Sequence, residues 1–590
     1  MTSNIPSLFK RIENEIENYL TNKVEISPEV YFSQYQLIKR LYKFKNKDLN
    51  KGSKINPDLS YDYYFDIISP RCDSEVKNLR FDTKNIMTFS ISPRKDFAAV
   101  YISNTQLKTW MVENGEDDKL KASVEEFSAN GNVIFKKVSG GYEKVDPLNM
   151  VITNIKAETI EDTAIIERQE MTASQILRMD SWYEDAKEDV IEHCGNKFFQ
   201  TSETTSESET TGKVFEIYEY TGEVSEKEYL ELGGNFNGDE NKYFLAKIIV
   251  AGLSETESNK KFTLFKEKIP SKHTMSDYYI DAHRGPYKGR FWREGMYEIL
   301  FDHQIRANEI GNQLATGLEW ASKVFFQSSD SSILANIRAD MENGDVILAK
   351  DLAQVNVRMQ SLDQLIADWN RLNSDADKLA NSFEVVRGDT PPSGTPFRMG
   401  ILMDQNAGKL FVLLRQKISI PYRRVFREWV LPEMVKKLKG QEIFRLVGDS
   451  DIIDQFRNIA VDSWYTSNLI AIGPHTREQG EALKQEKLDD MRNIDPTIEN
   501  TKEIWDGVLP RMMVTITGEN SDIQDQLQDL VNLVGLEQDP DRVNWILDTI
   551  YKSRNIPIPP KKEQAPPENL AVERQAVPQK TEIGPEQQQT

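Results

Sequence analysis

Cysteine is nearly absent from this chain of 590 residues, which contains only Cys72 and Cys194. Two cysteines far apart in sequence cannot form a disulfide framework or a cysteine-rich metal site, and they fit a reducing compartment. The five histidines are also scattered, and none belongs to an HxH, HxxxH or HExxH arrangement. The sequence therefore predicts no metal site and no cofactor.

Catalytic signatures are missing as well. The chain has no Walker A loop, no GxSxG element and no GxGxxG motif. The polar candidates near the middle of the chain are His283, Arg284, Asp302 and His303. Asp302 and His303 are adjacent, so on a helix they point about 100° apart and do not converge. We interpret these residues as polar groups in solvent or at a subunit contact, and we expect no enzyme activity.

The chain has no long apolar run, and it has fewer basic than acidic residues. No stretch approaches the length needed to cross a bilayer. Met1–Leu20 lacks the apolar core that marks a signal peptide, so we expect a protein made in the cytoplasm. The chain has 73 Lys and Arg against 94 Asp and Glu, a formal net charge of −21. This balance argues against a broad basic surface that wraps nucleic acid, but an acidic channel would let DNA slide without sticking.

The remaining composition is that of a folded protein, with 39% hydrophobic and 9% aromatic residues. The length allows about three or four domains. Residues 1–285 alternate between helical and strand patterns, which predicts an α/β body whose sheet also receives later segments. The basic cluster Lys39–Lys47 has interleaved aromatics, as nucleic-acid contacts do. We favour a solvated face anchored by Tyr42 and Phe44, because the surrounding chain is acidic.

Local signals place elements within this body. A helix that ends with a left-handed cap at Gly131 precedes a strand over Asn132–Val138. Thr172 and Gln175 have the spacing of a capping box at a helix start. The segments KVFEIYEY and KYFLAKIIV predict two more strands. The acidic, low-complexity Thr201–Gly212 predicts a mobile loop or an inserted surface segment.

The most distinctive stretch lies between Tyr287 and Phe397. A helix without proline is predicted over Lys288–Lys323, and a second helix over Ser361–Phe383 has apolar residues at helical spacing. The Gly/Pro-rich segment Val385–Pro396 cannot continue that helix. Small residues spaced four apart share one face of the first helix and allow another backbone to come close: Ala307, Gly311 and Ala315.

The segment between these helices, Val324–Arg358, predicts a compact insertion. It contains strand patterns at Val324–Phe326 and Asp345–Leu348 and a short helical pattern at Ser332–Met341. So small a unit buries little surface by itself. We therefore expect its strands to pair with neighbouring copies of the chain, although an ordinary insertion in a monomer is the alternative.

The C-terminal third is predicted to be largely helical. Phe397–Leu438 has a helical pattern that Pro421 and Pro432 should kink or interrupt. Residues 476–555 predict a charged helix followed by an amphipathic helical pair. Residues 556–590 are rich in Pro, Gln and Glu without any aromatic side chain, which predicts disorder.

This order of two helices, a compact insertion and a Gly/Pro-rich loop resembles the portal proteins of tailed double-stranded DNA bacteriophages. The resemblance covers about residues 80–475, and the loop Thr390–Gly400 (TPPSGTPFRMG) is most similar to portals of crAss-like, short-tailed phages. It implies an α+β, predominantly helical subunit of a ring of about twelve copies, closed by heterologous contacts. It also implies a channel that packages and ejects genomic DNA at the portal vertex of the virion, after assembly in the host cytoplasm.

The resemblance assigns the segments as follows: 1–285 wing, 286–322 first stem helix, 323–358 clip, 359–385 second stem helix, 386–397 channel loop, 398–475 kinked helix and return to the wing, 476–555 helical crown and 556–590 disordered tail. The residues implied near DNA are Arg387, Asp389, Thr390, Ser393 and Arg398 in and after the loop, and Asp363, Asp368 and Asp375 as a weakly repulsive lining. The small residues of the first helix become subunit-packing candidates. The implied partners are further copies of the chain, double-stranded DNA, terminase, the major capsid protein and tail or adaptor proteins, with no membrane.

Two alternatives stay open at this point. One is another virion structural protein, such as a head-tail adaptor or scaffold, although such chains are usually shorter and lack the two-helix stem. The other is a large cytoplasmic enzyme with dispersed catalytic residues. Native mass would separate a ring from both.

Overall fold

A computed structural model describes these residues of the chain: 7–21, 24–27, 30–32, 34–45, 65–81, 83, 86–92, 95–194, 214–253, 261–322, 325–327, 353–355, 361–380, 397–448, 450–493, 501–516 and 547. Several predicted segments lie outside them: the acidic segment 201–212, the small helix 332–341, the strand 345–348, the channel loop 386–396, the helical pair 522–553 apart from residue 547, and the tail 556–590. The description below concerns the described residues.

Helices make up most of the fold. In chain order they are α1 (Ser7–Thr21), α2 (Gln34–Lys45), α3 (Ser69–Leu79), α4 (Phe97–Glu113), α5 (Glu116–Asn130), α6 (Ala173–Leu177), α7 (Glu184–His193), α8 (Glu226–Glu231), α9 (Met296–Ile299), α10 (Phe301–Ser322), α11 (Ser361–Ala380), α13 (Phe397–Val425), the π-helical turn η5 (Phe426–Val430), α14 (Leu431–Lys436), α15 (Gly440–Val447), α16 (Ser450–Ile472), α17 (Arg477–Asn493) and α18 (Thr501–Val508).

The strands are β1 (Val24–Ser27), β2 (Val30–Phe32), β3 (Ile86–Ser90), β4 (Asn132–Val138), β5 (Gly141–Lys144), β6 (Met150–Ile152), β7 (Ile165–Thr172), β8 (Val214–Ser225), β9 (Tyr243–Ala251), β10 (Phe262–Lys268), β11 (Tyr279–His283), β12 (Phe325–Gln327), β13 (Ala353–Val355) and β14 (Met512–Ile516). The predicted α+β class is confirmed, with helix outweighing strand. Among the described helices, none combines the length and the apolar character needed to span a membrane.

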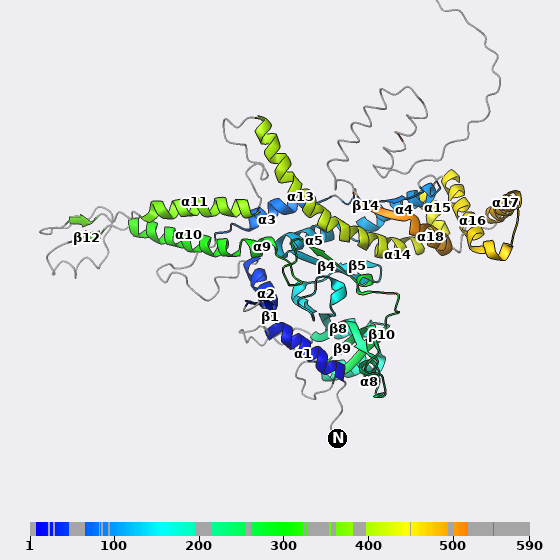
Figure 1. Ribbon diagram of the computed structural model, residues 1–590, viewed down its shortest axis with the longest axis horizontal. Coiled ribbons are helices and arrows are strands. Elements are labelled where there is room, and N and C mark those ends of the chain that lie inside the picture. Colours follow the sequence, from blue (N-terminus) through cyan, green and yellow to red (C-terminus); the bar gives the residue numbers. More distant parts are fainter. Residues whose placement is uncertain are drawn as a thin grey trace, which may run out of the picture.

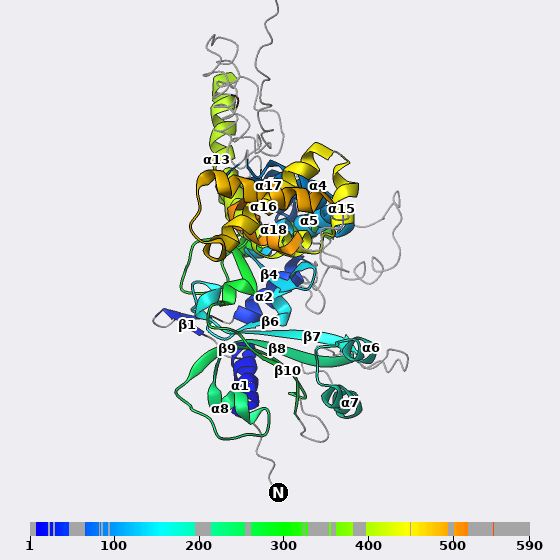
Figure 2. The same cartoon turned by 90° about the vertical axis from the view of Figure 1, so that its right-hand side faces the viewer.

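The molecule has a central body with three extensions (Figure 1). The body contains α3, α5, α9 and a three-stranded sheet in the order β11-β4-β5. A rod made of α10 and α11 projects on one side, and a helical lobe of α4 and α14 to α18 lies on the opposite side. A sheet lobe with the order β10-β9-β8-β7-β6 lies below the body (Figure 2).

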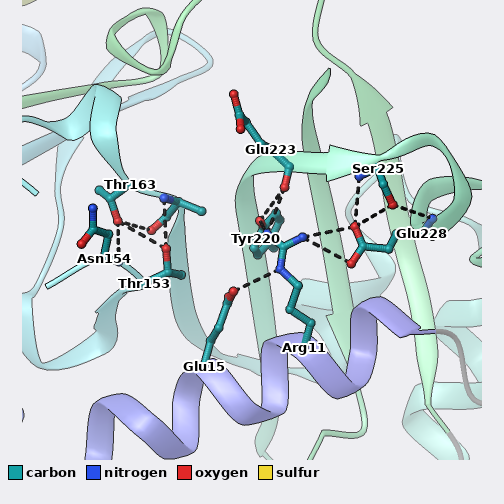
Figure 3. Close-up of polar contacts among 10 residues, drawn as sticks. Arg11, Glu15, Thr153, Asn154, Thr163, Tyr220, Glu223, Ser225 and Glu228 are labelled. Carbon is teal, nitrogen blue, oxygen red and sulfur yellow. Dashed lines mark hydrogen bonds and ion pairs between the residues drawn. The ribbon is translucent and has the colours of Figure 1, made fainter. Parts of the chain in front are cut away.

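The sheet lobe holds the N-terminal helix. Its strands are all antiparallel, and α1 buries an apolar stripe against them: Leu8, Ile12 and Ile16. Figure 3 shows the Arg11 guanidinium reaching from α1 to the Tyr220 hydroxyl and the Glu228 carboxylate. The predicted capping box is also present, because the Thr172 backbone N–H donates to Gln175 Oε1 at 2.8 Å.

In the body, the structure confirms the predicted helix that ends at Gly131 and the strand that follows it. Helix α5 ends at Gly131, whose φ of 81° is left-handed, and β4 follows at once. Asn132 is buried, and its Oδ1 accepts from the backbone N–H of Arg293 and from His283 Nδ1, each at 2.8 Å. Its Nδ2 donates to the carbonyls of Asn130 at 3.0 Å and Arg293 at 2.9 Å. One side chain thus joins the end of α5 to the chain that enters the rod.

The first long helix starts later than predicted. Residues 288–295 are not helical, α9 begins at Met296, and α10 begins at Phe301. The backbone at Gly295 packs so closely on the end of α5 that a Cβ there would collide with the carbonyl oxygen of Ala129. Arg290 and Arg293 are buried beside this contact. These tertiary contacts hold residues 288–295 in a non-helical path with bends at 289–292, although nothing in the local sequence forbids a helix.

The kinked helix differs in detail from its prediction. Pro421 lies inside α13 without ending it, and the irregularity follows as the π-helical turn η5. Pro432 occupies the first turn of α14, where a missing N–H costs no helical bond. Around the turn, aromatic rings pack edge to face, with Tyr422 5.0 Å from Phe135 and Phe426 6.0 Å from Trp110. The aromatic cluster therefore fixes this part of the helix in the body.

The last described strand, β14, connects the helical lobe to the body. The segment 476–555 was predicted to be helical, yet β14 pairs antiparallel with β3. A bidentate ion pair supports this pairing, because Arg511 donates to the buried Asp96 carboxylate at 2.9 and 2.6 Å. Its partner strand lies in the first hundred residues, so no local pattern could reveal it. β14 and β3 form a separate two-stranded sheet, whereas the described five-stranded and three-stranded sheets are built entirely from residues before 285.

Asn132→Ala should lower the free energy of unfolding by about 3 kcal/mol, because it leaves buried backbone groups of Arg293 without partners. Calorimetric melting of the full chain measures this. Asn237→Ala, at an exposed asparagine, is the matched control and should change stability by less than about 0.5 kcal/mol. Equal effects of the two substitutions would contradict the role of Asn132.

The buried carboxyl group of Glu116 should make the stability of the fold depend on pH. Its side chain is buried at the start of α5, and burial raises its pKa to about 7, opposed by a hydrogen bond from the Tyr142 hydroxyl. A raised folded-state pKa gives stability that is fully present below about 4.5 and is lost as pH rises through about 7. The loss is on the order of 3 kcal/mol.

Denaturant titrations between pH 4.5 and 8 should therefore show stability falling, and Glu116→Gln should flatten the profile. Glu188→Gln, the same change at an exposed carboxylate of α7, should leave the slope unchanged. If stability still fell with pH in Glu116→Gln, another titrating group would be responsible for the pH dependence.

Candidate subunit interface on the two-helix rod

The rod, defined as α10 and α11, extends away from the rest of the molecule (Figure 1). Its helices lie side by side and lead to the β12–β13 pair at the far end. Arg306 of α10 and Asp368 of α11 form an ion pair at 3.1 Å across the two helices. Near its base the rod contacts α3 and α9. Most of its length therefore faces the surroundings.

The short strands at the far end only partly match their prediction. Phe325–Gln327 is a strand, shifted by one residue from the predicted Val324–Phe326. Its antiparallel partner is Ala353–Val355, and the second predicted strand, Asp345–Leu348, lies outside the described residues. The register Phe325 to Val355 is set within one chain. This pair accordingly needs no second copy to form.

The small-residue face of α10 is used within the chain. Ala307 is fully buried, and a Cβ on Gly311 would overlap the ring of Phe65. Phe65 also packs edge to face on Trp369 of α11, with centroids 5.5 Å apart. Ala315 is half-buried further along the same face. Within one chain, Ala307 is therefore buried and Phe65 fills the space beside Gly311, which leaves Ala315 as the half-buried member of the predicted subunit-packing face.

Sequence patterns missed the residues that hold Phe65. Gln304 and Asn308 are buried on α10, and their side-chain amides bond to the backbone of residues 65 and 67. The one available signal was that two amides spaced four apart fall on the same face as Ala307 and Gly311. A polar pair on a buried face needs partners. The sequence does not say which segment supplies them.

The predicted acidic lining is partly neutralised within the chain. Asp368 pairs with Arg306, and Asp375 lies 3.2 Å from Lys378 and 3.8 Å from Arg371. Asp363 is exposed near the far end of the rod. Exposed ion pairs are individually weak, but they reduce the net negative field of two of the three aspartates. The weak repulsion of DNA that was predicted for the channel lining therefore applies best to Asp363.

Large apolar side chains remain exposed on the rod and on α13. They are Leu318 (61% exposed), Ile366 (49%), Leu379 (47%), Leu413 (50%) and Ile420 (48%). Leu413 and Ile420 are seven residues apart, so they share one face of α13. Single exposed apolar residues are ordinary, and these five are distributed over three helices, which makes them candidates for contacts with another chain.

The residues predicted nearest to DNA are mostly not placed. Arg387, Asp389, Thr390 and Ser393 lie outside the described residues, and Arg398 lies in the first turn of α13. Further along that helix, Arg424 pairs with Glu428 of the same chain at 3.3 Å.

The fold also places residues of the N-terminal basic cluster and the pair Asp302 and His303. Tyr42 anchors the N-terminal basic cluster as expected, because its hydroxyl donates to Glu126 at 3.1 Å. Arg40 of the same cluster lies over the ring of Phe301 at 4.3 Å. His303 is half-buried and the adjacent Asp302 is exposed, so the two do not converge.

One group with metal-ligand chemistry was not predicted. Asp189, Glu192 and His193 lie at the end of α7 with ligand atoms within 4.8 Å of one another. The two carboxylates are exposed, and His193 Nδ1 already bonds to the Asp189 carbonyl at 3.0 Å. The spacing i, i+3 and i+4 was the available signal. Exposed carboxylates at a helix end are common without an ion, and we assign none.

Gly311→Ala should lower the free energy of unfolding by about 1–3 kcal/mol, because its methyl group displaces the Phe65 ring. In a Phe65→Ala background the same change should become neutral or stabilising by up to about 1 kcal/mol, since alanine is the better helix former. Denaturant unfolding of the two single variants and the double variant measures the coupling. Additive effects would show that the ring does not occupy this face.

Comparison with known proteins does not place this chain in a family. No protein-family model matches it, and no match to a curated protein sequence was found. The functional argument therefore rests on the residues and on the arrangement of the elements.

Proposed function

We propose that this chain is a portal protein, the ring-forming subunit at one vertex of a tailed-phage capsid, through which genomic DNA is packaged and ejected. The single observation that carries the proposal is the rod. Two helices of 22 and 20 residues extend from a folded body and keep large apolar side chains exposed along their length. Such an arrangement is poorly suited to a monomer in water, because apolar surface favours burial.

The order of elements supports the same proposal. A mixed body precedes the rod, the β12–β13 pair lies between its helices, and a long kinked helix follows. This is the order of wing, stem, clip and kinked helix implied by the resemblance. The segment between α11 and α13, residues 381–396, holds the proposed channel loop.

The exposed face of α13 provides a surface for a neighbouring copy. Leu413 and Ile420 are about half exposed on one side of a helix whose opposite side is buried in the body, for example at Leu414 and Ile418. In a ring with heterologous contacts, a face of this kind meets a different face of the next subunit. The proposal therefore assigns Leu413 and Ile420 to the contact between subunits.

In the proposed ring the rods line a channel for duplex DNA. Asp363 supplies weak repulsion, and the pairs of Asp368 and Asp375 with basic residues limit adhesion by leaving little net charge. Arg387 and Arg398 are the proposed phosphate contacts, with Asp389, Thr390 and Ser393 in the same loop. The far end of the rod is the proposed docking surface for terminase during packaging and for tail or adaptor proteins afterwards, while the body faces the major capsid protein.

Multi-angle light scattering with negative-stain class averages tests the ring. We expect a mass near twelve times 67.9 kDa and rings with a central channel. Leu413→Asp should shift the mass towards that of the monomer, because a charge on a buried contact costs several kcal/mol.

Leu177→Asp is the matched control. Leu177 is 52% exposed on α6, in the sheet lobe, and its replacement should leave the assembly intact. A purified wild-type chain that is monomeric at all concentrations, with compact particles in the images, would refute the proposed function.

A further inference from the structure

The imidazole of His283 lies between two oxygen atoms where the body meets the chain that enters the rod. His283 on β11 is directly opposite Asn132 on β4, and Asp281 lies two residues earlier on the same face of β11. His283 Nδ1 is 2.8 Å from Asn132 Oδ1, and His283 Nε2 is 2.8 Å from Asp281 Oδ2. Each ring nitrogen therefore has its own oxygen partner.

The backbone fixes which atom Asn132 presents to the ring. Asn132 Nδ2 donates to the carbonyls of Asn130 at 3.0 Å and Arg293 at 2.9 Å, and Asn132 Oδ1 accepts from the Arg293 N–H at 2.8 Å. A turned amide would place its NH2 group against that N–H and its oxygen against both carbonyls, which are fixed acceptors. Asn132 thus presents an acceptor to His283.

Asp281 presents the second acceptor, because its carboxyl group is ionised. Burial acts to raise the pKa of Asp281, but the hydrogen bond and the charge of His283, together with the Arg424 guanidinium of α13, outweigh burial and lower that pKa. The carboxylate also attracts the buried Arg293. An ionised carboxylate accepts hydrogen bonds and donates none.

An acceptor on each side of the ring requires a proton on each nitrogen. A neutral imidazole has one N–H and one lone pair, so it would satisfy one partner and turn its lone pair towards the other oxygen. A half-turn of the ring would set carbon atoms against both oxygens. The doubly protonated imidazolium of His283 makes both bonds, and a hydrogen bond between charged partners is about twice as strong as a neutral one.

The other charges around the ring act against a second proton or are already paired. Arg284 follows His283 in the chain, but its guanidinium binds the Glu75 carboxylate of α3 at 2.8 and 2.9 Å. Lys417 of α13 donates to the Arg284 carbonyl at 2.7 Å. The His283 ring packs edge to face against Phe291, with centroids 5.2 Å apart, and its side chain is 17% exposed. The two acceptors therefore outweigh nearby cations in a site that water reaches only in part.

We propose that His283 is held as the imidazolium in the folded chain at neutral pH, and that loss of this proton weakens the joint, defined as the contact of Asn132 with residues 288–295. The Asn132 oxygen that accepts from His283 also accepts from Arg293, so the charged ring orders the side chain on which both backbone segments depend. The inference does not rest on the proposed function, because every partner belongs to one chain.

The sign of the pH dependence follows from linkage. A histidine that keeps its proton longer in the folded chain than in the unfolded chain adds stability that is fully present below about pH 6.5, the ordinary value for histidine. That stability is lost as pH rises until the folded chain also releases the proton. The joint should accordingly be strongest in mildly acidic solution and weaker in alkaline solution.

Hydrogen–deuterium exchange at histidine Cε1, read by mass spectrometry between pH 5 and 10, measures protonation residue by residue in the full chain, whatever its assembly. His273, whose Nδ1 lies 3.0 Å from the exposed Asp277 carboxylate, is the internal reference. His283 should release its proton about one pH unit or more above His273. Release at or below the pH of His273 overturns the proposal, and this comparison needs only the wild-type chain.

Asp281→Asn is the matched variant in the same measurement. A neutral amide can serve either form of the ring, so the difference between His283 and His273 should shrink by about half or more. An undiminished difference in this variant would mean that the carboxylate does not hold the proton, which also overturns the proposal.

Amide exchange at Arg293 tests the effect on the joint. A Glu116→Gln background removes the other expected titration, and rates are corrected for the intrinsic pH dependence of exchange. Protection of the Arg293 amide should fall about fivefold or more between pH 7 and 9.5, while protection of Tyr218 in β8 stays constant. His283→Gln, which cannot titrate, should abolish the change at Arg293. Constant protection at Arg293, a change that persists in His283→Gln, or an equal loss at Tyr218 overturns the proposal.

Discussion

The rest of the structure depends on a close contact between two backbone segments. The end of α5 at Gly131 and the chain entering α9 at Gly295 approach so closely that neither position has room for a Cβ. Asn132 adds side-chain bonds to both segments. This contact sets where the rod helix begins and in which direction it leaves the body. Its cost is a non-helical segment at 288–295 in place of two further turns of helix.

The body and the rod are stabilised in different ways. The body has an apolar core that includes rings of Phe135, Tyr422 and Phe426, and it holds the π-helical turn of the long helix in place. At its base the rod combines buried amides, an arginine and one phenylalanine, and further out it keeps apolar side chains exposed. Both the apolar core of the body and the buried amides at the base of the rod are close-packed, and a close-packed interior resists deformation.

The charges of the rod fit a conduit better than a binding groove. Aspartates predominate in α11, yet Asp368 and Asp375 have basic partners within the chain. A duplex close to such a surface meets neither a strong attraction nor a strong repulsion, because paired charges produce short-ranged fields that salt screens further. Asp363, exposed nearer the far end, adds a modest negative field. This weak interaction is what sliding requires.

The sequence by itself determined the local elements and the apolar faces. The stripe of α1, the left-handed cap at Gly131, the capping box at Thr172 and the extent of α11 follow from spacing and from backbone preferences that act within a few residues. It also placed a face of small residues on α10, although not its occupant. Only the tertiary structure decided that Phe65 fills that face at Gly311, that β14 pairs with β3 and that residues 288–295 are not helical. Each of these depends on a partner far away in the chain, and a local pattern carries no information about which distant segment will supply it.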